Sequence, residues 1–159
     1  MALLPILEFP DPRLRTVAKP VETFDADLQK RIDDMFETMY AAPGVGLAAT
    51  QIDWHRQLIV IDVSEEKDRP LVLINPRIVE SVGAQTYQEG CLSVPGMRGL
   101  VPRYPVLRYE GFDQYGNAID RTVDTHVKTL RAKLREVAPA ADPIVTHRGL
   151  GYGLDDPTR

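Results

Sequence analysis

Hydrophobic positions in an early part of this chain recur every three or four residues, the period of a helix with one buried face. The stripe begins after Asp25 and stops before Pro43-Gly44, which predicts a helix from about Asp25 to Ala42. Its apolar members are Leu28, Ile32, Met35, Phe36, Met39 and Tyr40. A second stripe predicts a helix from about Arg121 to Val137, with Lys and Arg side chains on the opposite face. The members of this second stripe are Val123, Val127, Leu130, Leu134 and Val137.

Shorter apolar runs between the two stripes have the length of strands. The clearest are Leu58–Val63 and Leu71–Ile74, which are separated by a charged turn, and we expect Asn75-Pro76 to end the second. Further strands are predicted at Arg77–Val82, around Tyr87 and at the alternating run Val106–Phe112, which a turn follows. The runs Ile144–His147 and Tyr152–Leu154 predict a hairpin around residues 148–151. Strands combined with two long helices predict the α+β class.

Length and composition describe one globular domain. The chain has 159 residues, of which 43% are hydrophobic and 26% charged, typical of a soluble protein with its own core. No apolar run approaches the ~20 residues of a membrane span, and the first residues lack the pattern of a secretory signal. The only cysteine, Cys91, has no partner for an internal disulfide. We therefore expect a cytoplasmic protein that does not enter a membrane.

The formal net charge of −4 is unevenly distributed along the chain. Residues 121–159 carry seven Lys and Arg against five Asp and Glu, a balance of +2, which leaves −6 for residues 1–120. An acidic body with a basic segment can indicate a nucleic-acid partner. The alternative is a solvated basic face of the second helix, and charge alone does not separate the two.

Two short segments carry the residues best suited to chemistry. Cys91 follows Gly90, which lets the backbone approach a ligand closely, and its thiolate is a nucleophile or a soft metal ligand. The alternative is a buried and inert cysteine. The pair Gly44-x-Gly46 indicates either a close backbone approach to a ligand or a tight helix-to-strand turn. A nucleotide-binding loop is excluded because a helix, not a strand, precedes these glycines.

The segments Gly44–Gln51 and Glu89–Ser93 resemble two of the three signature motifs of peptide deformylase, a metallohydrolase that removes formyl groups from new polypeptides. Three further segments are similar to the same family, namely residues 7–15, 33–40 and 73–76. The resemblance runs from Ile6 to about Asp120. It implies a peptide-deformylase-like fold of mixed strands packed on helices, N-formyl-methionyl peptides as substrates and a monomeric chain.

The resemblance also implies roles for individual residues. Cys91 would bind a divalent metal, iron (Fe²⁺) in the cell and nickel (Ni²⁺) or zinc (Zn²⁺) in preparations. Gln51 and the backbone N–H of Leu92 would stabilise the developing oxyanion. The remaining implied residues contact the peptide or shape the site around the metal, and they are Gly44, Val45, Gly46, Tyr87, Glu89, Gly90 and Arg98.

The third signature of that family is absent from this sequence. It is a helical His-Glu-x-x-His, which supplies two metal ligands and a general base, and the corresponding region here reads Arg131-Ala132-Lys133-Leu134-Arg135-Glu136-Val137. The chain has three histidines, His55, His126 and His147, and no pair has the required spacing. His126 is the one weak candidate for a second metal ligand. One thiolate and one imidazole make a poor site, so we expect the chain not to hold catalytic metal tightly.

The C-terminal segment resembles a different family. Residues 121–134 are similar to the recognition helix of an OmpR/PhoB-type winged-helix response regulator, and residues 144–152 to its wing hairpin. This resemblance implies a DNA-binding role for Arg121, Thr122, His126, Lys128, Arg131, Arg148 and Tyr152. The sheet, the first two helices and the receiver domain of such regulators have no counterpart in the chain.

The two resemblances meet near Asp120-Arg121. We therefore expect a deformylase-like body over residues 1–120 and a non-family helix and hairpin over residues 121–159, packed as part of one domain. The first functional hypothesis is metal-dependent deformylation, with the missing motif predicting an inactive chain. The alternatives are a DNA-binding fragment of a two-component response regulator and a catalytically inactive chimera.

Overall fold

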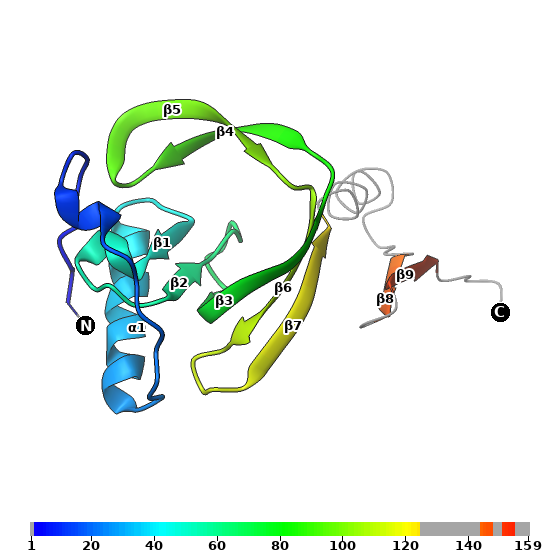
Figure 1. Ribbon diagram of the computed structural model, residues 1–159, viewed down its shortest axis with the longest axis horizontal. Helices are drawn as coiled ribbons and strands as arrows, with labels where there is room; N and C mark the ends of the chain where they lie inside the picture. Colours follow the sequence, from blue (N-terminus) through cyan, green and yellow to red (C-terminus); the bar gives the residue numbers. More distant parts are fainter. Residues whose placement is uncertain (1, 125–143, 148–150, 155–159) are drawn as a thin grey trace.

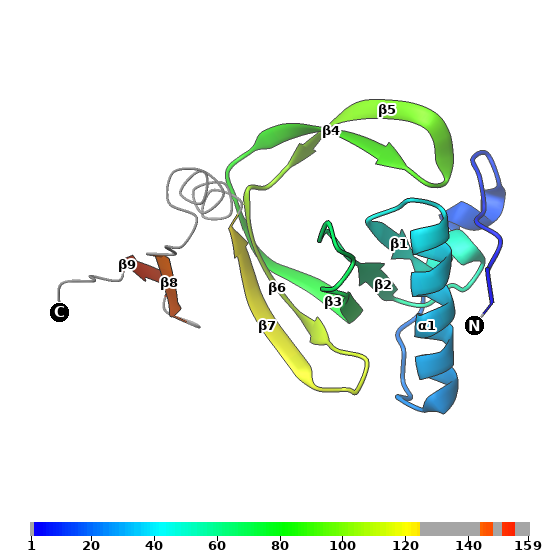
Figure 2. The ribbon, with the colours of Figure 1, turned by 180° about the vertical axis from the view of Figure 1, so that it is seen from behind.

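The computed structural model describes residues 2–124, 144–147 and 151–154. Within these residues one long helix, α1, lies against β1 and β2, while β6 and β7 form the opposite end of the same sheet (Figure 1). The β4–β5 hairpin arches above both ends, as the view from behind also shows (Figure 2). Helix and mixed strands give the α+β class that the sequence predicts. No helix among the described residues is long and apolar enough to cross a membrane.

Helix α1 spans Ala26–Ala41 and confirms the first predicted helix. It begins at Asp25, whose side chain accepts a hydrogen bond from the backbone N–H of Leu28 at 2.9 Å, a standard N-cap. It ends at Ala42, and the N–H of Gly44 then donates to the carbonyl of Met39 at 2.9 Å. Most of the predicted stripe is buried, and Met35 and Met39 have no exposed surface. The apolar period therefore reports the buried face correctly.

The main sheet has five antiparallel strands in the order β1-β2-β3-β6-β7. Its strands are β1 Gly46–Ala48, β2 Leu58–Ile61, β3 Leu71–Val82, β6 Val106–Phe112 and β7 Ala118–Asp124. Two 3₁₀ helices, η1 (Pro12–Arg15) and η2 (Ala49–Ile52), contact each other, and η2 follows β1 directly. Two further two-stranded sheets pair β4 (Gln85–Cys91) with β5 (Val94–Arg103), and β8 (Ile144–His147) with β9 (Gly151–Leu154).

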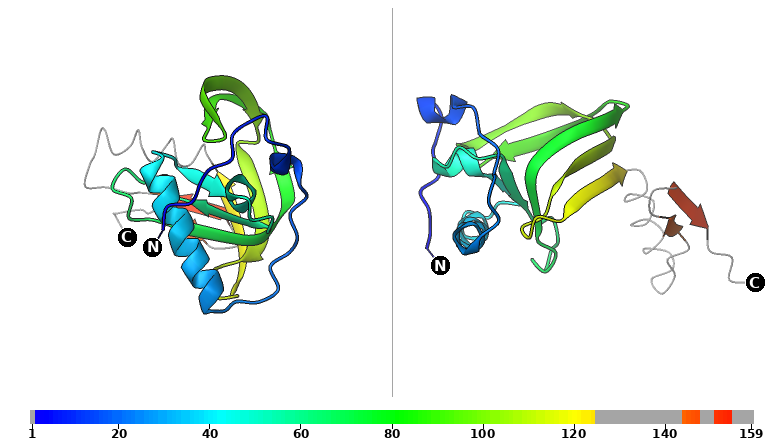
Figure 3. Two further views of the ribbon diagram at one scale, coloured as in Figure 1. Left: turned by 90° about the vertical axis from the view of Figure 1, so that its left-hand side faces the viewer. Right: turned by 60° about the horizontal axis from the view of Figure 1, so that its bottom comes forward.

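The hydrophobic core is formed by α1 and the first three strands. Figure 3 shows the helix lying against this end of the sheet. Alternate residues of β2 and β3 face the helix, so Leu58 pairs with Ile74 and Val60 with Val72 in the buried layer. The core cluster as a whole is Val21, Leu28, Ile32, Met35, Met39, Leu47, Ala49, Ile52, Leu58, Val60, Val72 and Ile74.

Two sequence expectations about strands and helices are wrong. Asn75-Pro76 does not end the second strand, because β3 continues to Val82 through a register shift between Ile74 and Arg77. Asn75 adopts a positive φ of 50° and its side-chain amide bonds both the N–H and the carbonyl of Val21, at 2.8 and 2.9 Å. These tertiary hydrogen bonds stabilise a bulge where the sequence alone indicates a stop.

The predicted second helix does not begin at Arg121. Residues 121–124 belong to β7, where Arg121 is opposite Tyr109 and Val123 is opposite Leu107 of β6. The spacing of Val123 and Val127 fits a helix, but pairing with β6, the preceding strand across the turn at residues 113–117, decides the conformation of residues 121–124. Residues 125–137 lie outside the described part of the chain. The predicted C-terminal hairpin is confirmed as the pair β8–β9.

Candidate functional site

Gln51 lies where the first motif meets the second. Its Oε1 accepts the backbone N–H of Ala48 at 2.9 Å, and its Nε2 donates to Ser93 Oγ at 3.0 Å. The same Nε2 lies 3.9 Å from Cys91 Sγ. Because a backbone N–H is only a donor, the amide oxygen must face Ala48, and the NH₂ group is left pointing toward Cys91. The loop geometry therefore fixes which end of this amide reaches the thiol.

Cys91 ends β4 at an irregularity of the hairpin, where it is opposite Val94. Its side chain is exposed, whereas Ser93 two residues later is buried. The N-terminal segment bonds both motifs, because the N–H of Leu7 donates to the carbonyl of Gln51 at 2.7 Å and the N–H of Phe9 donates to the carbonyl of Ser93 at 2.8 Å. The exposed thiol of Cys91 is therefore carried by a hairpin that bonds to the N-terminal segment and to the loop of Gln51.

Gly44 explains how closely the two motifs approach. A Cβ atom at this position would lie 2.7 Å from Cδ1 of Leu92, closer than side-chain contacts allow. The absent side chain thus leaves room for Leu92 to pack over the turn after α1. Val45 next to it is exposed, and its carbonyl accepts the N–H of Asp62 at 2.9 Å. The sequence left open a close approach to a ligand or a tight helix-to-strand turn, and the structure shows the turn between α1 and β1, with Leu92 packed against Gly44.

A buried acidic group beside β1 was not anticipated from the sequence. Asp62 accepts hydrogen bonds from the Tyr40 hydroxyl at 2.7 Å and from the Ser64 hydroxyl and N–H at 2.6 and 2.9 Å. The Ser64 hydroxyl is the main reason that the pKa of Asp62 lies below its ordinary value, with Tyr40 adding to the effect. Burial, and then the Asp62 carboxylate, raise the pKa of Tyr40 to about 12. An aspartate directly after an apolar strand was the available signal.

Three predicted peptide-contacting residues, Tyr87, Glu89 and Arg98, lie on the β4–β5 hairpin. Glu89 forms a two-pronged ion pair with Arg103 at 2.9 and 2.8 Å, and that hydrogen-bonded guanidinium lowers the pKa of Glu89. The Tyr87 hydroxyl donates to Gln85 at 2.9 Å, and Gly90 is opposite Arg98 in the strand register. The hydrogen bonds of Tyr87 and Glu89 therefore stay within the hairpin.

The residues around Cys91 do not fit a divalent metal. In the described part of the chain no three side chains of the His, Cys, Asp and Glu types gather in one place. The Nε2 atom of His55 lies 2.9 Å from the carbonyl of Arg13. A catalytic metal site takes three protein ligands. His126, the weak second candidate, lies outside the described residues, so Cys91 is the one predicted ligand that the structure places at the site.

The residues predicted to contact DNA are not presented on a helix where the structure describes them. Arg121 and Thr122 are consecutive residues of the strand β7, so their side chains point to opposite faces of the sheet. Tyr152 is in β9, opposite Thr146. The other four, His126, Lys128, Arg131 and Arg148, lie outside the described residues. The recognition-helix interpretation is therefore wrong for Arg121 and Thr122, because β6 pairs with that segment.

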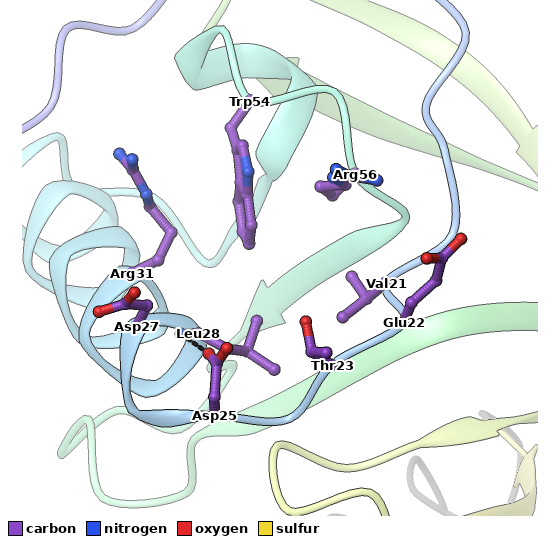
Figure 4. A pocket seen from close by; sticks show the side chains of 9 residues that line it. All are labelled: Val21, Glu22, Thr23, Asp25, Asp27, Leu28, Arg31, Trp54 and Arg56. Carbon is purple, nitrogen blue, oxygen red and sulfur yellow. Dashed lines mark hydrogen bonds between the residues drawn. The ribbon is translucent and has the colours of Figure 1, made fainter.

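A pocket of about 300 Å³ opens beside the first turn of α1, away from the motif residues (Figure 4). Trp54 forms one wall and Leu28 and Val21 lie at its base, while the guanidinium of Arg31 stands 5.5 Å from the centre of the Trp54 ring. None of the predicted site residues lines it. The candidate site is therefore the Gln51–Cys91–Ser93 junction, and this pocket is a separate feature of the surface.

Comparison with known proteins gives one consistent family. A family model described as polypeptide deformylase matches residues 3–133, which extends past the junction expected near Asp120-Arg121. The peptide deformylase of Chromobacterium violaceum is 57% identical over 124 residues, covering 78% of this chain and 74% of that protein. That of Cellvibrio japonicus is 59% identical over 121 residues, covering 76% and 72%.

Solved structures agree with the sequence relatives. A peptide deformylase from Legionella pneumophila has a TM-score of 0.75 and 48% identity, covering 77% of this chain and 73% of that chain. A peptide deformylase from Synechococcus elongatus in complex with actinonin has a TM-score of 0.74 and 40% identity, covering 76% and 67%. Family membership implies a divalent metal and does not fix which ion. Because the structure brings the two motifs together and these comparisons agree, the chain belongs to the polypeptide deformylase family.

Proposed function

We propose that this chain recognises N-formyl-methionyl peptides at the junction of Gln51, Leu92 and the Gly44–Gly46 segment. The observation that carries the proposal is the orientation of the Gln51 amide, whose oxygen is held by the N–H of Ala48 so that its NH₂ group faces Cys91. An NH₂ group fixed in advance is a suitable donor to the carbonyl oxygen of a formyl group. The backbone N–H of Leu92 follows Cys91 directly and is the second donor in this proposal.

The edge of the sheet supplies the binding surface for the peptide backbone. In the described residues β1 is the terminal strand of the five-stranded sheet, with β2 as its single neighbour. An extended peptide can add to such an edge through backbone hydrogen bonds. Val45 is exposed at the start of this edge and offers an apolar contact to the methionine side chain. This is the arrangement expected for a chain that binds peptides by their N-terminal residues.

Hydrolysis requires more than recognition. The family is named for removing the formyl group, and a bound divalent metal would supply an activated water to such a reaction. The described residues of this chain supply Cys91 and do not complete a donor set for that metal. We therefore assign recognition to the residues in place and derive no hydrolytic step from them.

Calorimetric titration of the full chain with formyl-Met-Ala-Ser tests the proposal. We expect saturable binding that weakens about tenfold in Gln51→Ala, the effect of one lost hydrogen bond of ~1.4 kcal/mol. Gln88→Ala is the matched control, because Gln88 is an exposed glutamine of β4, the strand that ends at Cys91. The affinity of this variant is expected to equal that of the unmodified chain.

The ligand itself provides the second control. The unformylated tripeptide Met-Ala-Ser is expected to bind more weakly than the formylated one. Its affinity should be the same for Gln51→Ala and for the unmodified chain, because it lacks the oxygen that Gln51 contacts. No binding of either peptide, or equal binding of the formylated peptide by all three proteins, would contradict the proposal.

A further inference from the structure

We infer that Cys91 is a free thiol in this chain and that no resident divalent metal is bound to it. The inference concerns the metal that family membership implies, and it does not depend on peptide recognition. It rests on the donors available in the described residues and on the sequence at the third motif.

The potential ligands in the described residues are committed to other partners. Glu89, two residues before Cys91, has both carboxylate oxygens on Arg103 at 2.9 and 2.8 Å. Asp62 is buried and saturated by the hydroxyls of Tyr40 and Ser64. Moving either carboxylate to a metal beside Cys91 would break a charge-assisted or buried hydrogen bond. The neighbour that does approach the thiol is the Gln51 amide, whose NH₂ group is a donor and not a metal ligand.

The rest of the sequence lacks the pair of histidines that the family uses. The helix that would bring two histidines one turn apart, with a glutamate beside them, has no match anywhere in the 159 residues. Residues 121–135 instead carry five Lys and Arg side chains against one aspartate, Asp124. A single thiolate does not hold zinc, nickel or iron against water, since stable sites use three or four protein ligands.

Metal retention is the first test. The full chain and its Cys91→Ala variant are incubated separately with excess Ni²⁺, Zn²⁺ and, without oxygen, Fe²⁺, then desalted and analysed by mass spectrometry of the elements. A deformylase that retains the His-Glu-x-x-His motif is treated in parallel to show that the procedure preserves a real site. We expect far less than one ion per chain, and the same amount in both variants. One ion per chain, lost in Cys91→Ala, would overturn the inference.

Thiol alkylation is the second test, and it does not depend on activity. Cys91 is exposed and is the chain's one cysteine, so iodoacetamide should add one carbamidomethyl group, with iodide leaving the reagent and the thiolate sulfur forming the new bond to carbon. We expect the same rate after incubation with Ni²⁺ as after incubation with EDTA. A rate reduced more than tenfold by Ni²⁺ would show a metal-bound sulfur and would overturn the inference.

The two proposals fail in different ways. If formyl-Met-Ala-Ser does not bind while Cys91 alkylates freely, recognition is refuted and the free thiol stands. If Ni²⁺ is retained through Cys91 and the peptide is hydrolysed, recognition stands and the free thiol is refuted. Titration of the peptide in EDTA links the two, because a free thiol predicts that peptide affinity is unchanged by the chelator.

Discussion

The two regions of the molecule that meet at the site differ sharply in how they are stabilised. The helix region, residues 7–74, contains nearly all of the buried apolar side chains of the described chain, with Pro105 and Tyr109 the exceptions. The outer region, residues 75–124, exposes Ile78, Val82 and Val123 on its strands and is linked by surface ion pairs such as Arg108–Asp120 at 2.7 Å. Exposed ion pairs contribute little to stability. The outer region therefore depends on strand pairing with a neighbour that has its own core.

This difference shows how the candidate site is divided. Gln51 belongs to the helix region, where packing holds its loop, and Cys91 belongs to the outer region, where the hairpin carries it. Ser93 is the bridge, since its hydroxyl accepts from Gln51 and its carbonyl accepts from Phe9. Gln51, the proposed donor to the formyl oxygen, is thus held by the packed region. Cys91, on the hairpin, lacks metal-binding partners among the described residues.

The largest expected effect comes from the core of the helix region, on which both regions depend. Met39 is fully buried between α1 and the sheet, so Met39→Ala leaves a cavity and should lower the free energy of unfolding by about 2–5 kcal/mol. Urea denaturation followed by circular dichroism measures it. Met97→Ala is the control, because Met97 is exposed on β5 and should change little. Equal losses in the two variants would contradict the division into a packed region and an outer region.

A smaller loss in the free energy of unfolding is expected where the outer region joins the helix region. Gly111 of β6 lies against β3, and a Cβ there would be 2.9 Å from the backbone oxygen of Ile74. Gly111→Ala forces backbone to move, which typically costs about 1–3 kcal/mol. Gly99→Ala is the matched control, since a Cβ at Gly99 meets nothing within 4 Å. Hydrogen exchange should show the loss of protection first in β6 and β7, and uniform loss would argue against a separate junction.

Low pH should also remove stabilising contributions of different size from the two regions. The pKa of Asp62 and that of Asp120 are both lowered in the folded chain, by hydrogen bonds from Ser64 and Arg108 respectively. Each carboxylate therefore stabilises the fold above the ordinary aspartate value of about 3.9, and this contribution is lost as the pH falls through the lowered folded value. Because Asp62 is buried and Asp120 is exposed, Asp62→Asn should flatten the decline of the urea midpoint below pH ~4 more than Asp120→Asn. The reverse order would refute this explanation.

The smallest expected effect on stability is at the contact between the motifs. Gly44→Ala places a Cβ 2.7 Å from Cδ1 of Leu92, but that atom is the end of a flexible side chain that can rotate away. The loss should stay below about 1 kcal/mol, while formyl-peptide affinity falls because Leu92 carries a proposed donor. Gly46→Ala, whose Cβ would make an ordinary 3.7 Å contact with the Val60 oxygen, should not strain this contact. A large stability loss in Gly44→Ala would mean that Leu92 is held rigidly.

Local patterns predicted a good part of this fold. The stripe of α1 has a cap at Asp25 and a stop at Pro43-Gly44, so its limits are set by residues close in sequence. The run Val106–Phe112 alternates and became β6 without change. In contrast, the bulge at Asn75 depends on Val21, a partner far along the chain that no local pattern contains. The strand at residues 121–124 depends on β6, its neighbour across the turn at residues 113–117, and the helical spacing of Val123 and Val127 misled the prediction there although the turn itself was evident.

The candidate site was predicted in outline for a related reason. Family resemblance places Gln51, Leu92 and Cys91 together, and the structure brings Gln51 to Cys91 and Ser93. The resemblance did not foresee that Glu89 is bound by Arg103 across the hairpin or that Asp62 is buried with Tyr40. Such pairings depend on which side chains face each other after folding. The missing histidines are evident from the sequence alone, because the spacing of that motif is fixed along the chain and needs no tertiary contact to define it.

The bonds from Leu7 to Gln51 and from Phe9 to Ser93 have a consequence for the order in which the protein forms. During synthesis the beginning of the chain leaves the ribosome first, yet its second partner does not exist until residue 93 has been added. The N-terminal segment must therefore wait for the end of β4 and dock late, since long-range closure follows local structure. A nascent chain of this protein would form its helix before the candidate site can be completed.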